Sequence, residues 1–169
     1  MDLLKTATDW AKAELVSTPF FVLFGLVFIT GSLGFWQFGK TEMAKAYVMP
    51  TLIAGVLLMI IGCGLFFTNK MRIQQFEKDY HVHPTKFLQK EIERSEATLK
   101  EYQNVVFTGI PILIAVCALA LLFVKTPIWK TSLITSMAML IVILLIDGTA
   151  SARIKAYDQA LKQIEKHQN

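Results

Sequence analysis

The stretch that decides the fold is the polar segment at residues 69 to 104, which reads NKMRIQQFEKDYHVHPTKFLQKEIERSEATLKEYQN. It lies in the middle of a 169-residue chain and holds seven of the seventeen Lys and Arg residues. Long apolar runs flank it on both sides, and about 20 apolar residues suffice to cross the hydrocarbon core of a bilayer. The pattern predicts a connection outside the membrane between two membrane-embedded halves.

The composition of the whole chain agrees with this interpretation. Charged residues make up only 18% of the chain, hydrophobic residues make up 54%, and the mean hydropathy is +0.48, whereas soluble domains carry about 25% charged residues. The two cysteines, Cys63 and Cys117, both lie inside apolar runs, so no disulfide framework is predicted. The first apolar run is long and follows a polar arm, which indicates a retained span rather than a cleaved signal peptide.

Four apolar runs have the length of membrane spans, and a short connection joins the two members of each pair. Short connections favour antiparallel neighbours, and Pro19 suits the first turn of a helix. The predicted fold class is an all-α integral membrane protein with four transmembrane helices in two antiparallel hairpins and amphipathic cytoplasmic helices. Its predicted parts are an N-terminal amphipathic helix (1–18), transmembrane hairpin 1 (19–68), a cytoplasmic helical hairpin turning near Pro84 (69–104), transmembrane hairpin 2 (105–149) and a C-terminal amphipathic helix (150–169).

The cytoplasmic helices carry apolar stripes at helical spacing. Because such stripes must be covered by each other, by lipid or by a partner, we interpret their apolar residues as a partner-binding set: Leu88, Ile92, Leu99, Ile154, Tyr157 and Leu161. The N-terminal helix allows two interpretations. It lies in the membrane interface with Trp10 at headgroup depth, or its apolar face packs on another cytoplasmic helix.

The distribution of cations predicts the orientation. Thirteen Lys and Arg residues lie in the N-terminal arm, the central segment and the tail, and four lie in the two short connections. Since cytoplasmic loops carry the excess of Lys and Arg, both termini are predicted to be cytoplasmic, in a multi-pass protein of the cell inner (plasma) membrane. Aromatic side chains near the ends of the spans are predicted interfacial anchors: Trp10, Trp36, Tyr47 and Trp129.

The two halves of the chain share a short pattern. Arg72-Ile73 after the second span and Arg153-Ile154 after the fourth both begin Arg-Ile-x-x-aromatic-acid, at a shift of 81 residues. The pattern favours a tandem repeat in which both halves have the same topology.

Few residues suggest chemistry. Asp147 is the one acid within or next to the apolar cores, where a carboxylate is costly and often functional. The simpler interpretation is an interfacial ion pair, with Arg153 or with Lys70 and Arg72 nearby, or a polar group at the end of a helix. His81 and His83 are a weak metal candidate, because a tetrahedral site needs three or four ligands. No cofactor is predicted. Acids alternate with the cations of the central segment, which argues against nucleic-acid binding.

The leading function predicted from the sequence is a non-enzymatic membrane scaffold or accessory subunit that docks a membrane-protein partner or copies of itself through its cytoplasmic helices. The alternative is a homo-oligomeric channel, with tight packing at small residues and a path lined by hydroxyl groups: Thr30, Ser32, Thr51, Ser132, Thr135 and Ser136. A membrane-embedded enzyme ranks third, since no catalytic constellation is readable.

Overall fold

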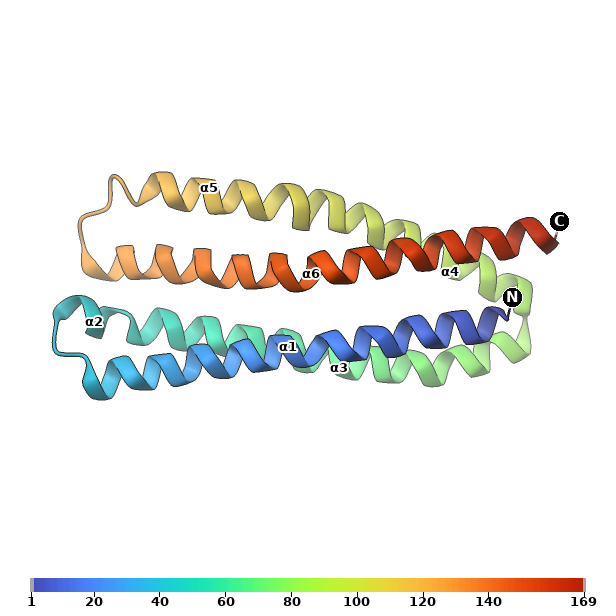
Figure 1. Cartoon of the computed structure of the whole chain (residues 1–169), viewed down its shortest axis with the longest axis horizontal. Coiled ribbons are helices and arrows are strands. Elements are labelled where there is room, and N and C mark those ends of the chain that lie inside the picture. The colour runs from blue at the N-terminus through green and yellow to red at the C-terminus, as the bar shows by residue number, and fades with distance from the viewer. Residues whose placement is uncertain (1, 169) are drawn as a thin grey trace.

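A computed structural model describes residues 2–168 of the chain, and Figure 1 shows them as long helical rods lying side by side. The described residues form helices and connections, with no strand among them. In chain order the elements are α1 (Leu3–Phe38), α2 (Glu42–Ala46), α3 (Val48–Val82), α4 (Pro84–Glu101), the π-helix η1 (Tyr102–Gly109), α5 (Ile110–Ala120) and α6 (Pro127–Gln168).

Four helical stretches are long and apolar enough to cross a membrane, judged by length and composition. They are Leu3–Phe38, Glu42–Val82, Pro84–Ala120 and Pro127–His167. The predicted all-helical class with four membrane-length helices is confirmed at this level.

The expected helix boundary at Pro19 is wrong, because α1 runs through this residue without interruption. A proline inside a helix has no N–H for the carbonyl of the preceding turn, which here belongs to Leu15. The neighbouring Thr18 replaces that donor, since its hydroxyl donates to the Leu15 carbonyl at 3.0 Å. In the same way α3 and α6 continue past positions 68 and 149, so most of the predicted parts are segments of continuous helices.

The helix of the third span is irregular just before Gly109 and Pro111. Residues Tyr102–Gly109 form a π-helix, in which Thr108 donates its hydroxyl to the Gln103 carbonyl five residues earlier at 2.8 Å. Pro111 follows in the first turn of α5. The wider π turns relieve the clash between a proline ring and the carbonyl of the preceding turn.

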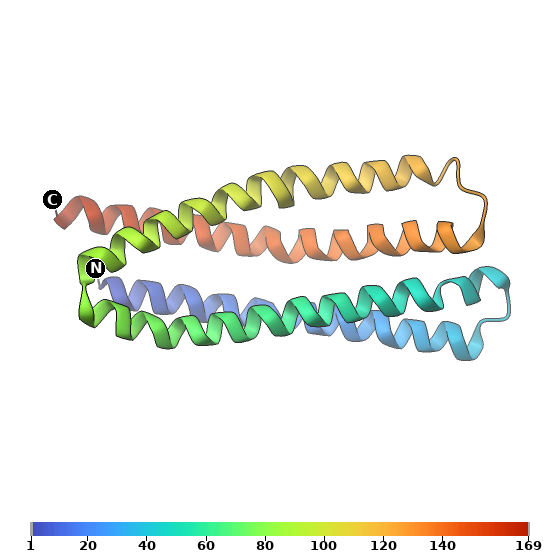
Figure 2. The same cartoon turned by 180° about the vertical axis from the view of Figure 1, so that it is seen from behind.

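Among the long helices, α1 and α3 form one pair, and α6 contacts several other helices (Figures 1 and 2). α1 runs antiparallel to α3 along its length, while α6 packs against α1, α3, α4 and α5. Close approach of α1 and α3 depends on glycine: a Cβ at Gly55 would lie 2.7 Å from Ile29 Cγ1 and 2.8 Å from the Gly25 carbonyl oxygen. Small residues allow such backbone contact between apolar helices.

The molecule has two hydrophobic cores of unequal size. The larger core lies in the part we name the polar bundle (residues 3–18, 69–104 and 150–167), at the end where both termini and the α3–α4 corner meet. The smaller core, in the membrane-length half (19–68 and 105–149), consists of four buried side chains: Phe21, Leu58, Val142 and Ile146.

Candidate functional site

Trp10 is the centre of the polar bundle. Its ring stacks on Tyr157 of α6, with ring centroids 4.8 Å apart and an interplanar angle of 12°. The guanidinium carbon of Arg94 lies 4.5 Å from the Trp10 ring centroid, and that of Arg72 lies 5.6 Å from it. Cations within about 6 Å of a tryptophan ring are attracted by its electron-rich face. The packing alternative for the N-terminal helix is therefore the one observed, and Trp10 is not a lipid-facing anchor.

Glu91 holds the inner side of this cluster. Its carboxylate accepts from Arg94 Nε at 3.1 Å and from the Tyr157 hydroxyl at 2.8 Å, and its side chain is only 4% exposed. Burial raises the pKa of Tyr157 above its usual range, and the negative charge of Glu91 raises that pKa further. Glu91 is therefore a structural group that fixes α4 against α6.

Two further polar contacts join the helices of the bundle. Arg153 of α6 pairs with Glu14 of α1, with 3.0 Å between Nε and Oε1, and also donates to Ser17. Ser95 of α4 donates to the buried Asp158 of α6 at 2.8 Å. These charges are matched inside the protein, as buried charges must be.

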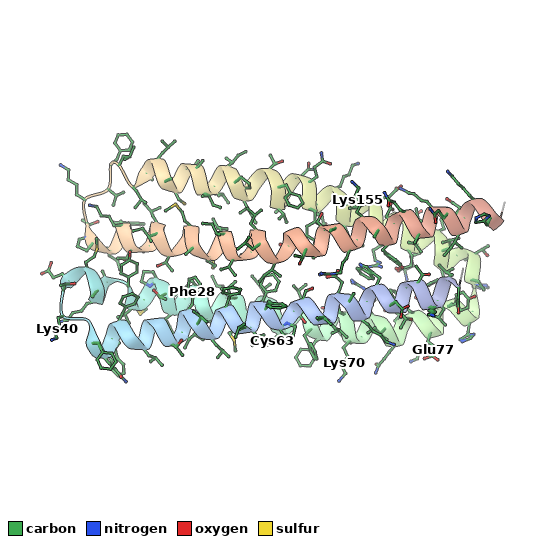
Figure 3. The ribbon with its side chains drawn as sticks, viewed as in Figure 1. Phe28, Lys40, Cys63, Lys70, Glu77 and Lys155 are labelled. Atoms are coloured by element: carbon green, nitrogen blue, oxygen red, sulfur yellow. The ribbon has the colours of Figure 1, made fainter. Side chains whose placement is uncertain are left out.

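A cavity of about 470 Å³ lies beside this cluster, and we name it the interfacial pocket. Residues of α1, α3, α4, η1 and α6 line it: Trp10, Glu14, Leu65, Asn69, Arg72, Arg94, Thr98, Glu101, Tyr102, Val105, Val106 and Ile154. In sequence, the pocket lies where the apolar runs of the second and third spans meet the polar segment 69–104. Figure 3 shows the same transition along the rods, with Lys70, Glu77 and Lys155 on the half that carries the termini.

The charged groups around the pocket differ in their pairing. Glu14 and Arg94 are each engaged in an ion pair, with Arg153 and Glu91 respectively. Arg72 donates to Asn69 Oδ1 at 3.0 Å and makes no ion pair with any described residue. Burial lowers the pKa of Arg72, and the nearby charge of Arg94 lowers it further, while the charges of Glu91 and Glu14 offset part of this effect.

The residues predicted to bind a partner are covered by the chain's own helices. Leu88, Ile154, Tyr157 and Leu161 are buried in the larger core, and Ile92 and Leu99 pack against it. The sequence left three possibilities for covering these apolar stripes: each other, lipid or a partner. In the structure the stripes pack on each other. A partner cannot reach the four buried side chains in this conformation, and Ile92 and Leu99 are only partly exposed.

Asp147 lacks the ion pair expected from the sequence. It is half-buried on α6, and its side chain makes no hydrogen bond or ion pair within the part of the chain that the structure describes. Arg153, the expected partner, binds Glu14 instead. The predicted repeat places Arg153 and Arg72 at equivalent positions, and both lie in the polar bundle, although they have different partners.

The histidines lie at the α3–α4 corner. His81 and His83 are exposed, and a search of the described residues finds no group of three or more His, Cys, Asp or Glu side chains that could hold a metal ion. The predicted turn is confirmed: α3 ends at Val82 and α4 begins at Pro84.

Four of the six hydroxyl groups proposed to line a channel donate hydrogen bonds to backbone carbonyls of this chain. The Ser32 hydroxyl donates to the Val48 carbonyl at 2.7 Å, and that of Thr51 donates to the Tyr47 carbonyl at 2.7 Å. Thr30 and Ser132 donate to carbonyls of their own helices. Thr135 is buried and Ser136 half-buried on α6.

The other predicted anchors lie at the end of the molecule opposite the termini. Trp36 and Trp129 expose 69% and 64% of their surface. Tyr47 stacks on Phe35 with centroids 5.0 Å apart. These exposures suit side chains at the boundary between lipid and water.

The pocket residues were missed in the sequence because each belongs to a pattern with another explanation. Arg72 and Glu101 are single members of a mixed-charge segment, and Trp10 was assigned to the lipid interface. One signal was available: a tryptophan on the apolar face of a helix, with arginines at the borders of two other stripes, indicates guanidinium–aromatic stacking once these helices pack together.

No family model, curated protein or solved structure gives a significant match to this chain.

Proposed function

We propose that this chain is a non-enzymatic, multi-pass membrane protein that binds an amphiphilic ligand in the interfacial pocket. The polar bundle and both termini lie on the cytoplasmic side of the inner membrane, following the excess of Lys and Arg. The observation that carries the proposal is the mixed lining of the pocket, which combines apolar residues of the predicted spans with charged residues that lie beyond the ends of those spans.

The apolar part of the lining reaches the surface of the protein. Leu65 of α3 and Val105 of η1 both line it, and they expose 39% and 61% of their surface. The charged part of the lining includes Arg72 and Glu101, beyond the ends of the predicted spans. A ligand with an apolar tail in the bilayer and a polar head in the bundle satisfies both parts.

The size of the pocket suits this role. Ligand pockets have volumes of roughly 300–1,000 Å³ and combine an apolar lining with a few polar groups that fix the orientation of the ligand. The interfacial pocket falls within this range. It also has a wall of π-helix, an element that is rare and occurs frequently at functional sites.

The scaffold or accessory role predicted from the sequence takes a modified form. Docking through the six stripe residues is not proposed, because four of them are buried and the other two are partly covered by the same core. An accessory subunit of this architecture would sense or retain an amphiphile at the membrane boundary, and a partner would contact the outer faces of the helices. The tandem repeat with a shift of 81 stays a prediction.

Trp10 offers a direct test, since it lines the pocket and only two other tryptophans are present. A Trp36→Phe/Trp129→Phe variant leaves Trp10 as the single fluorophore. In bilayers of phospholipid with brominated acyl chains, we expect Trp10 to be quenched although the bundle shields it from bulk lipid, because a lipid enters the pocket. Val105→Phe should narrow the apolar part of the pocket and reduce that quenching.

Leu119→Phe is the matched control, because Leu119 is also 61% exposed but does not line the pocket. A variant that retains Trp36 alone shows that the quencher is active. Equal Trp10 quenching in the Val105→Phe and Leu119→Phe proteins, or no Trp10 quenching in either, would contradict the proposal.

A further inference from the structure

Two charged side chains of opposite sign stand at the interfacial pocket without an ion-pair partner. Arg72 and Glu101 both line the cavity, and within residues 2–168 neither forms a salt bridge, with each other or with a third group. The other two charged residues of the lining are paired with side chains from the bundle. The pocket therefore presents one half-buried cation and one exposed carboxylate, both without an ion-pair partner, to a ligand.

A third group in the lining also lacks a partner. Trp10 is only 9% exposed, and its Nε1 is a buried donor with no acceptor among the described residues. An unsatisfied buried donor costs about 1–3 kcal/mol, so native structures leave few of them. Because Nε1 is fully covered by protein atoms, Trp10 contributes an apolar wall to the pocket and its N–H does not face a ligand there.

The geometry points to a phospholipid with a zwitterionic, primary-amine headgroup as the ligand of this pocket, an assignment that rests on the proposed function. Its phosphodiester accepts hydrogen bonds from the Arg72 guanidinium, and its ammonium group donates to the Glu101 carboxylate. One acyl chain leaves the pocket along Leu65 and Val105.

The charge of the lining separates this ligand from other membrane lipids. Arg72 and Arg94 are balanced by Glu14 and Glu101, so the lining as a whole is neutral and matches a neutral zwitterion. An anionic headgroup would satisfy Arg72 and leave Glu101 unmatched beside additional negative charge. A quaternary ammonium has no N–H groups, so a choline headgroup gives Glu101 no hydrogen bond.

Native mass spectrometry of the full-length protein in mild detergent tests the assignment. The protein is incubated with an equimolar mixture of phosphatidylethanolamine, phosphatidylcholine and phosphatidylglycerol of the same acyl composition, and the bound lipid is identified by mass. We expect the ethanolamine lipid to be retained about tenfold over each of the others. Soluble glycerophosphoethanolamine, added in a second arm, should not displace it, because it lacks the apolar chains.

Three variants test which pocket residues are responsible for lipid retention and for the headgroup preference. Glu101→Gln should abolish the preference for the ethanolamine lipid while total lipid retention persists. Arg72→Gln should lower retention of all three lipids, and Val105→Phe should do so without changing any charge. Glu77→Gln and Lys70→Gln, exposed changes on α3 outside the pocket, are the matched controls, and melting temperature establishes that each variant is folded.

The outcomes separate this assignment from the proposed function. If the protein retains the three lipids equally and Val105→Phe lowers that retention, the headgroup assignment is overturned and amphiphile binding stands. Preferential retention of the glycerol lipid, or displacement by the soluble compound at the concentration of the lipid, would also overturn it. Retention that neither Arg72→Gln nor Val105→Phe changes would contradict both.

Discussion

The polar bundle and the membrane-length half are built from the same four rods but hold together differently. The polar bundle buries eleven hydrophobic side chains in one core and adds ion pairs between helices, among them Glu14–Arg153. The core cluster of the membrane-length half holds four buried side chains, and the most apolar window of its third span has only 11% of its residues buried. Large apolar side chains such as Leu122 and Phe123 are almost fully exposed.

The proposed placement of the two halves, one in water and one in lipid, accounts for this difference. In water the burial of apolar surface drives helices together, so the polar bundle needs a dense core. In lipid that driving force is absent, and helices associate through close backbone packing at small residues, as at Gly25 and Gly55. The interfacial pocket lies at the boundary between the polar bundle, with its dense core, and the membrane-length half, whose helices meet at small residues.

The largest expected contrast lies along α6. Leu161 is 0% exposed in the polar bundle, and Leu145 is 65% exposed in the membrane-length half. Leu161→Ala should lower the free energy of unfolding by about 3–4 kcal/mol, since it leaves a cavity in a packed core. Leu145→Ala should change it by less than about 0.5 kcal/mol. Denaturant titration of the purified protein in detergent, followed by Trp10 fluorescence, measures both; similar losses would show that the halves do not differ in packing.

Glu91 offers the next contrast, within α4. Glu91→Gln removes the buried partner of Arg94 and weakens the hydrogen bond from Tyr157, so we expect a loss of about 3 kcal/mol. Glu93→Gln, an exposed acid on the same helix, should have almost no effect. The account of Glu91 as a structural anchor fails if the two variants unfold at the same denaturant concentration.

The membrane-length half is most sensitive at its glycine contacts. Gly55→Ala inserts a methyl group against Ile29 and the Gly25 carbonyl, and we expect a cost of about 1–3 kcal/mol from overpacking. A Cβ at Gly64 on the same helix meets nothing within 4 Å. Gly64→Ala should therefore be neutral or slightly stabilising, because alanine favours helix. Melting temperatures in detergent compare the pair, and equal shifts would exclude the proposed α1–α3 contact.

The smallest expected effect is a loss of stability at alkaline pH. Burial and Glu91 raise the folded-state pKa of Tyr157, so the folded protein keeps a proton that the unfolded chain releases near pH 10. The contribution of Tyr157 is complete below that pH and is lost as the pH rises further. Tyr157→Phe should flatten the decline in stability above pH 10, and an unchanged slope would contradict this origin. Unfolding titrations between pH 8 and pH 11 measure it.

The sequence was sufficient for the class of fold because hydropathy and cation placement are local properties. Four membrane-length helices, the turn at His83 and the irregular entry before Pro111 all follow from composition and proline chemistry. The break at Pro19 was wrong, because the effect of a proline depends on whether a neighbouring hydroxyl replaces the lost donor. Thr18 does so here.

The site was beyond the sequence for a different reason. The same stripe residue, Leu161 for example, serves an internal core or a partner equally well until the position of the other helices is known. Trp10 shows the same ambiguity, since an aromatic side chain on an amphipathic helix suits lipid and protein alike. Long-range pairs such as Glu14–Arg153, 139 residues apart, have no local signature.

The most direct test of the account is the depth of α6 in a bilayer. In a protein without Cys63 and Cys117, single spin labels at the outward-facing positions 134, 141, 145, 152, 155 and 166 are compared for collision with oxygen, which concentrates in lipid, and with a water-soluble paramagnetic reagent. We predict that the first three positions lie in lipid, that the last three lie in water, and that the crossover falls between 145 and 152, at the level of the interfacial pocket. A water-accessible position 141, or a lipid-exposed position 155, would contradict the boundary on which the proposed ligand site depends.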